Sequence, residues 1–122
     1  MNIFLRIRIL ILCALFSSSF VTADEKSPIT ITEDSFGCVI DMTPVRGFFV
    51  DNLSGDLEGT VKIANSATGG KYPPGSVVQL VPGEVMVKHN EGFNSATNDW
   101  EFFELEVSAE GSKIGKRGFV DV

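Results

Sequence analysis

The chain has 122 residues, and its 16 acidic side chains outnumber its 10 lysines and arginines, which gives a formal net charge of −6. This length is enough for one small domain. An acidic chain without a basic patch repels nucleic acid and anionic membranes, so neither is expected as a partner.

The chain begins with the features of a secretory signal peptide. Residues 6–8 carry two arginines, residues 9–16 are apolar, and residues 21–23 (Val-Thr-Ala) supply the small side chains that a signal peptidase reads. The apolar stretch is well short of the roughly 20 residues that a membrane-spanning helix needs. We therefore expect cleavage after Ala23, no membrane contact afterwards, and a periplasmic or secreted domain of residues 24–122.

The first half of this domain predicts short strands. Apolar and β-branched residues gather between turn-forming residues over 29–32, 36–42 and 45–50, which favours a strand in each. Residues 51–56 are rich in Asp, Asn and Gly and predict a solvent-exposed turn. Residues 57–64 alternate as a further strand would, and a short helix is the other interpretation.

The clearest pattern lies between residues 72 and 107. Three β-rich runs, over residues 72–81, 85–89 and 98–107, are separated by a Pro-Gly turn and a polar loop, which predicts three successive antiparallel strands. Side chains alternate along a strand, so the third run divides into two faces. One face carries Phe103, Leu105 and Val107, and the other carries Trp100, Phe102, Glu104 and Glu106.

A last strand is expected over residues 113–120. The whole pattern predicts a mostly β domain, a single small antiparallel sheet or barrel of six to eight strands with little helix.

The reactive side chains are few. Beyond the leader Cys38 is the only cysteine, so no internal disulfide can form, and its apolar neighbours predict a buried, inert thiol. His89 is the only histidine, which excludes a His-based metal cluster within one chain. Its place at the end of a predicted strand favours a surface side chain. We therefore predict no metal site from these residues.

Three segments occur in an order and spacing typical of one protein family. They are residues 45–51 (Val-Arg-Gly-Phe-Phe-Val-Asp), residues 72–78 (Tyr-Pro-Pro-Gly-Ser-Val-Val), and residues 92–94 with 98–103 (Gly-Phe-Asn and Asn-Asp-Trp-Glu-Phe-Phe). Together they resemble the cytochrome P-460 family of exported c-type haem proteins, whose relatives include the β-type cytochromes c prime. The resemblance implies a mainly β fold that holds one haem c against the sheet. It also implies a bacterial periplasm and a periplasmic electron-transfer partner.

Two features depart from the pattern of that family. Its haem is attached by Cys-x-x-Cys-His, which these 122 residues do not contain, so we expect a domain that is incomplete at its C-terminus and an attachment motif beyond residue 122. The hydroxylamine-oxidising members link the haem to a lysine at the position that Leu80 occupies here. The resemblance therefore implies binding of a small gas or nitrogen oxide, or electron transfer, in preference to hydroxylamine oxidation.

The matching segments and strand faces give six candidates for the wall of a haem pocket: Arg46, Phe49, Leu80, Met86, Trp100 and Phe102. The other interpretation of Arg46 is an exposed strand residue paired with a carboxylate, and that of the remaining five is core packing. Two other functions remain open from the sequence. One is a haem-free module that binds a small apolar ligand on the same sheet. The other is a homodimer formed when the last strand pairs with another chain.

Overall fold

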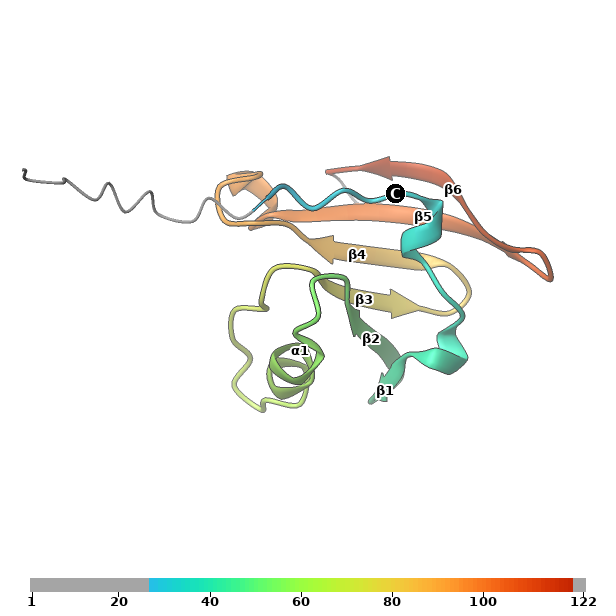
Figure 1. The fold of residues 1–122 in the computed structure, drawn as a ribbon. Coiled ribbons are helices and arrows are strands. Elements are labelled where there is room, and N and C mark those ends of the chain that lie inside the picture. Colours follow the sequence, from blue (N-terminus) through green and yellow to red (C-terminus); the bar gives the residue numbers. More distant parts are fainter. Residues whose placement is uncertain (1–26, 120–122) are drawn as a thin grey trace, which may run out of the picture.

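The structure is a computed structural model that describes residues 27–119. Its centre is an open six-stranded antiparallel sheet in which each strand pairs with its neighbours in sequence (Figure 1). The strands are β1 (Thr43–Val45), β2 (Phe48–Asn52), β3 (Ser76–Leu80), β4 (Glu84–Lys88), β5 (Trp100–Ser108) and β6 (Gly111–Gly118). The helical elements are α1 (Leu57–Ala64) and the 3₁₀ turns η1 (Glu33–Ser35), η2 (Val39–Asp41) and η3 (Ser95–Thr97). The predicted mostly β antiparallel domain is confirmed.

The predicted leader, with its cleavage after Ala23, lies outside the described residues. Within residues 27–119 no helix is long and apolar enough to cross a membrane.

One face of the sheet is covered by the segment that precedes β1. This segment runs from the β5–β6 side of the sheet to β1 (Figure 1). Its Ile31 and Phe36 side chains are buried in the main core. The Phe36 and Phe103 ring centroids are 5.2 Å apart. Val77, Val85, Val87 and Leu105 complete this core, so the predicted alternation of β5 is confirmed: Phe103 and Leu105 point inward.

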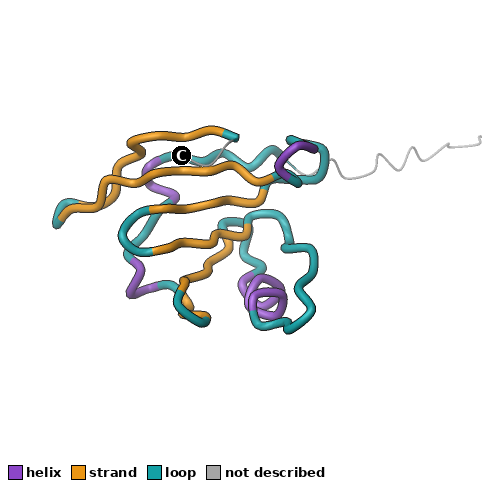
Figure 2. Tube along the Cα trace, turned by 180° about the vertical axis from the view of Figure 1, so that it is seen from behind, coloured by secondary structure: helices purple, strands orange, loops and turns teal. Residues whose placement is uncertain are grey.

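The opposite face is covered only in part. There α1 packs against β1 and β2 (Figure 2). Val45, Val50 and Ala64 form a second, smaller core between these elements. Over β3, β4 and β5 no described segment covers this face to the same extent, and the Leu80 side chain remains 46% exposed. A partly apolar surface of the sheet is therefore open to solvent.

The structure corrects several predictions for the first half of the domain. Residues 29–32 are extended without pairing in the sheet, and residues 36–42 contain η2 in place of a strand. The strand predicted over residues 45–50 is a hairpin, because Arg46 (φ 41°) and Gly47 (φ 93°) both adopt left-handed conformations that turn the chain between β1 and β2.

Residues 57–64 form α1, so the strand interpretation was wrong and the helix interpretation is confirmed. The Asp56 carboxylate caps this helix by accepting a hydrogen bond from the Gly59 backbone N–H at 2.9 Å. Thr60 and Ala64, four residues apart, are its buried residues, since positions i and i+4 lie on the same side of a helix.

The environments predicted for Cys38 and His89 were both wrong. Cys38 is exposed, because only Phe36 of its apolar run enters the core. His89 is buried with 5% exposure, because it follows Val85 and Val87 in alternation onto the covered face. Its Nε2 lies 2.9 Å from Oε1 of the buried Glu101, and Phe93 stacks on its ring with a centroid distance of 3.6 Å.

Candidate functional site

The uncovered face of the sheet brings together three of the predicted haem-pocket residues. Leu80 lies on β3, Met86 on β4 and Phe102 on β5. Met86 pairs in register with Val78 and with Phe102, so the four side chains share one face of three adjacent strands. They line a cavity of about 400 Å³, together with Glu84, Val85 and Phe103.

Trp100, a fourth predicted residue, lies on the same face beside this apolar cavity. Trp100 of β5 pairs in register with Lys88 of β4. This pair is the neighbour, on the same face, of the pair formed by Met86 and Phe102. The Tyr72 ring meets the Trp100 ring at nearly a right angle, with centroids 5.4 Å apart. The Lys88 Nζ lies 5.2 Å from the Trp100 ring centroid, within the range of a cation–π contact.

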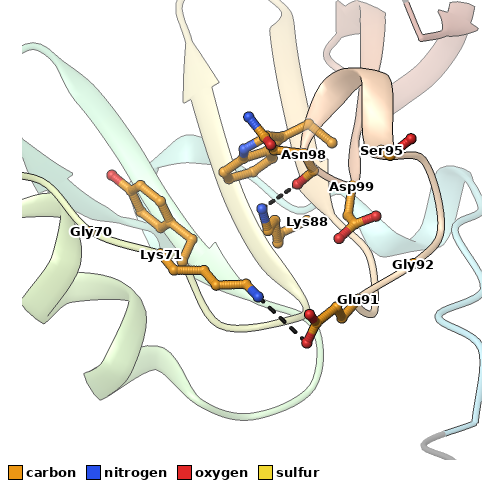
Figure 3. Close-up of a pocket in the computed structure, with 10 residues that line it drawn as sticks. Gly70, Lys71, Lys88, Glu91, Gly92, Ser95, Asn98 and Asp99 are labelled. Carbon is orange, nitrogen blue, oxygen red and sulfur yellow. Dashed lines mark hydrogen bonds and ion pairs between the residues drawn. The ribbon is translucent and has the colours of Figure 1, made fainter.

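Tyr72, Lys88 and Trp100 line a second, more polar cavity of about 660 Å³. Figure 3 shows this cavity. Its wall is completed by Gly70, Lys71, Glu91, Gly92, Ser95, Asn98 and Asp99. The dashed lines in Figure 3 join Lys88 to Asn98 and Lys71 to Glu91. The two cavities thus place an apolar surface and a charged surface next to each other on one side of β4 and β5.

Lys88 is the most buried of the charged residues that line the polar cavity. The residue is 5% exposed, and its Nζ donates a hydrogen bond to the Asn98 carbonyl oxygen. The pKa of Lys88 is lower than usual, mainly because the ammonium group is buried. The negative charge of Asp99 raises this pKa in part, and the positive charge of Lys71 lowers it further. The pKa of Asp99 is also lowered, first because the Asn94 backbone N–H donates a hydrogen bond to its carboxylate at 2.9 Å.

Arg46 and Phe49 do not join the other four candidates. The Arg46 Nη2 donates a hydrogen bond to the Ala64 carbonyl oxygen at 2.9 Å, so the guanidinium caps the C-terminal end of α1. Within residues 27–119 it forms no ion pair with a carboxylate. Phe49 pairs in register with Gln79 on the opposite face of the sheet. The hairpin turn explains this, because it fixes which residues of β2 face α1.

Sequence reasoning missed Val78, Tyr72 and Lys88 as residues of this face. Val78 could have been found, because it lies two residues before Leu80 and therefore on the same face of β3. The same rule relates Lys88 to Met86. Tyr72 lies in the loop before β3, where alternation gives no information.

No protein-family model, curated protein or solved structure matches the chain. The resemblance to the cytochrome P-460 family remains a prediction from the three sequence segments.

The described residues fit the flat, apolar side of a haem but do not supply its attachment. Val78, Leu80, Met86 and Phe102 form a continuous apolar surface, and the Met86 thioether is a group that can ligate haem iron. His89 points to the opposite face, and Cys38 is the one cysteine among residues 27–119. That part of the chain also has no cluster of three or more His, Cys, Asp or Glu side chains able to hold a metal ion.

Proposed function

We propose that the uncovered face of β3, β4 and β5 holds a haem c and that the protein is a periplasmic redox or small-gas-binding protein. The observation that carries the proposal is that Leu80, Met86 and Phe102 line one cavity. Each of the three was a candidate haem-pocket residue from the sequence alone. A flat apolar ligand seated there would remove apolar surface from water, which contributes roughly 25 cal/mol per Å² buried.

The polar cavity supports the same proposal. Haem has a flat, largely apolar porphyrin macrocycle and two carboxylate side groups, so an apolar surface with cationic side chains near one end suits it. Lys88 and Lys71 line the cavity next to Trp100, one residue pair away from Met86 and Phe102. The exposed Lys71 ammonium group, which lies 3.5 Å from Glu91, is a suitable partner for one of those carboxylates, whereas Lys88 is buried against the Asn98 carbonyl oxygen.

In this proposal the chain's own residues bind and orient the haem, and the haem supplies the electron-transfer or gas-binding chemistry. Leu80 offers no hydrogen-bond donor to a polar substrate, so the surface favours a small neutral ligand. The attachment motif that the resemblance implies is not contained in residues 1–122. The net charge of −6 favours a basic electron-transfer partner.

Haem binding can be tested with two charge substitutions on opposite faces of the sheet. Leu80 is 46% exposed in the apolar cavity, and Val107 is 58% exposed on the other face of β5, so both sites accept a glutamate without burying its charge. The purified wild type, Leu80→Glu and Val107→Glu are titrated with haemin while the Soret band and the fluorescence of Trp100, the only tryptophan, are recorded.

We expect haemin affinity to fall at least tenfold in Leu80→Glu, since a carboxylate must be desolvated beneath the macrocycle, and to remain unchanged in Val107→Glu. Equal haemin affinities for all three proteins would show that the haemin lies elsewhere and would overturn the proposal.

A second candidate is a haem-free module that binds a small apolar ligand in the same cavity. The observation that favours it is the volume of about 400 Å³, which lies in the lower part of the usual range for small-molecule sites. It predicts that an apolar dye such as 1-anilinonaphthalene-8-sulfonate binds the wild type, that Leu80→Glu weakens this binding, and that haemin does not displace the dye. Displacement of the dye by one equivalent of haemin would favour the haem proposal.

A further inference from the structure

A separate cavity lies on the opposite side of the sheet from the proposed haem site. It has a volume of about 510 Å³ and lies between the segment that precedes β1, the β3–β4 turn and the β5–β6 hairpin. Its wall is formed by Phe36, Gly37, Cys38, Val39, Gln79, Val81, Pro82, Val107, Ser108, Gly111 and Ser112. Among the residues that the structure describes, this wall contains no charged side chain, and most of it is apolar.

Gln79 is the polar residue that makes this cavity unusual. The residue is 2% exposed, yet its carboxamide has no hydrogen-bond partner anywhere in residues 27–119. In the same part of the chain every side-chain nitrogen or oxygen that is completely shielded from solvent does have a partner. The Gln79 amide therefore reaches the open space of the cavity, although the rest of the side chain is enclosed.

Because the amide borders the open space of the cavity, water can hydrate it there, and an occupant must replace those hydrogen bonds. A group that pairs with the amide in this enclosed position gains a net of about 0.5–1.5 kcal/mol for each hydrogen bond. The carboxamide offers one N–H donor and one C=O acceptor side by side, so its best partner presents the same two groups in the reverse order. The uncharged wall excludes an ionic partner, whose charge would remain uncompensated.

We propose that this cavity binds a small neutral molecule that carries a primary or cyclic amide on an apolar body. The amide forms two reciprocal hydrogen bonds with the Gln79 carboxamide, and the apolar body packs against Phe36, Val39 and Val107. A volume of about 510 Å³ is within the range of small-molecule sites. The exposed Cys38 thiol lines the same cavity, so an occupant also shields it from reagents.

The proposal is tested with benzamide and acetophenone, two probes of nearly the same shape in which an amide NH₂ replaces a methyl group. Binding to the ¹⁵N-labelled protein is followed by NMR, where Gln79, the only glutamine, gives one identifiable side-chain NH₂ pair. We expect benzamide to shift this pair saturably and to bind roughly tenfold more tightly than acetophenone, as expected for one or two net hydrogen bonds. The Gln79→Leu variant should lose that preference.

The matched control is Met86→Ala, which alters the opposite face and should keep the preference for benzamide. Protection of Cys38 from N-ethylmaleimide is an independent measurement on the wild type, so it does not depend on how Gln79→Leu folds. Benzamide should slow this labelling and acetophenone should slow it less at the same concentration. Equal affinity for the two probes, or benzamide shifts confined to the Met86 face, would overturn the proposal.

Discussion

Replacing Glu101 with glutamine is expected to lower the free energy of unfolding at pH 7 by about 2–3 kcal/mol. The Glu101 side chain is 7% exposed and lies 2.9 Å from His89 Nε2, 2.9 Å from Arg117 Nε and 3.1 Å from Arg117 Nη2. Hydrogen bonds to charged groups contribute about 1.5–3 kcal/mol, and breaking a buried ion pair costs roughly 3–5 kcal/mol. We expect less than the full cost, because Arg117 is 45% exposed and glutamine keeps one acceptor oxygen.

The substitution also changes how stability depends on pH. Burial alone would raise the pKa of Glu101, but the hydrogen bonds and charges of Arg117 and His89 outweigh it, so the pKa is lower than usual. A carboxyl group with a lowered folded-state pKa stabilises the fold above its unfolded-state pKa, about 4.3, and this contribution is lost as the pH falls through the folded-state value. The stability difference between wild type and Glu101→Gln should therefore narrow below about pH 4.3.

The assay is urea unfolding followed by Trp100 fluorescence, at pH 7 and at a series of lower pH values. The control is Glu104→Gln, because Glu104 lies 3.5 Å from Lys116 in a pair whose side chains are 47% and 66% exposed. Such a surface pair contributes about 0–1 kcal/mol, so this variant should unfold almost as the wild type does. Identical midpoints and slopes for the two variants at pH 7 would refute the reasoning.

Two further substitutions test the packing of α1 and of the loop before β3. Thr60→Val should destabilise the fold by about 1–3 kcal/mol in the same urea assay. The reason is that the fully buried Thr60 hydroxyl forms hydrogen bonds with Asn52 at 3.0 Å and with Ser76 at 2.7 Å. An unchanged unfolding midpoint would contradict this. Gly75→Ala should lower the melting temperature, because φ is +86° and a Cβ would lie 2.5 Å from the Ser54 Oγ. Gly37→Ala, where a Cβ meets nothing within 4 Å, should have little effect, and equal shifts would count against the steric argument.

The central strands could be predicted because their alternation is long and is interrupted by strong turn signals. β3, β4 and β5 form where the sequence indicated them, and Phe103 and Leu105 of β5 face the core as expected, whereas Val107 near the end of the strand is 58% exposed. The first half could not be predicted as well, because its runs are short and ambiguous. The Arg46-Gly47 turn places a non-glycine residue in a left-handed conformation, which local propensity disfavours.

The site could be predicted where strand alternation applied. Alternation placed Trp100 and Phe102 on one face of β5, but the pairing of β3, β4 and β5 that brings Leu80 and Met86 to Phe102 is known only from the structure. Alternation extended by one step would also have placed His89 with Val87 on the covered face. The partner of His89 could not be predicted, because Glu101 is brought to it by the pairing of β4 with β5 across 12 residues.

The order of the strands has a consequence for folding. Because each strand pairs with the preceding one, the sheet can form by successive local closures, which favours rapid folding. Docking of the segment that precedes β1 requires the closure of a much longer chain loop, since the Ile31 carbonyl oxygen accepts a hydrogen bond from Arg117, which lies 86 residues away in the sequence. This segment cannot dock until β5 and β6 are in place. The part of the described chain that the ribosome makes first is therefore the last to pack, and until then the apolar core face of β3, β4 and β5 is bare and prone to aggregation.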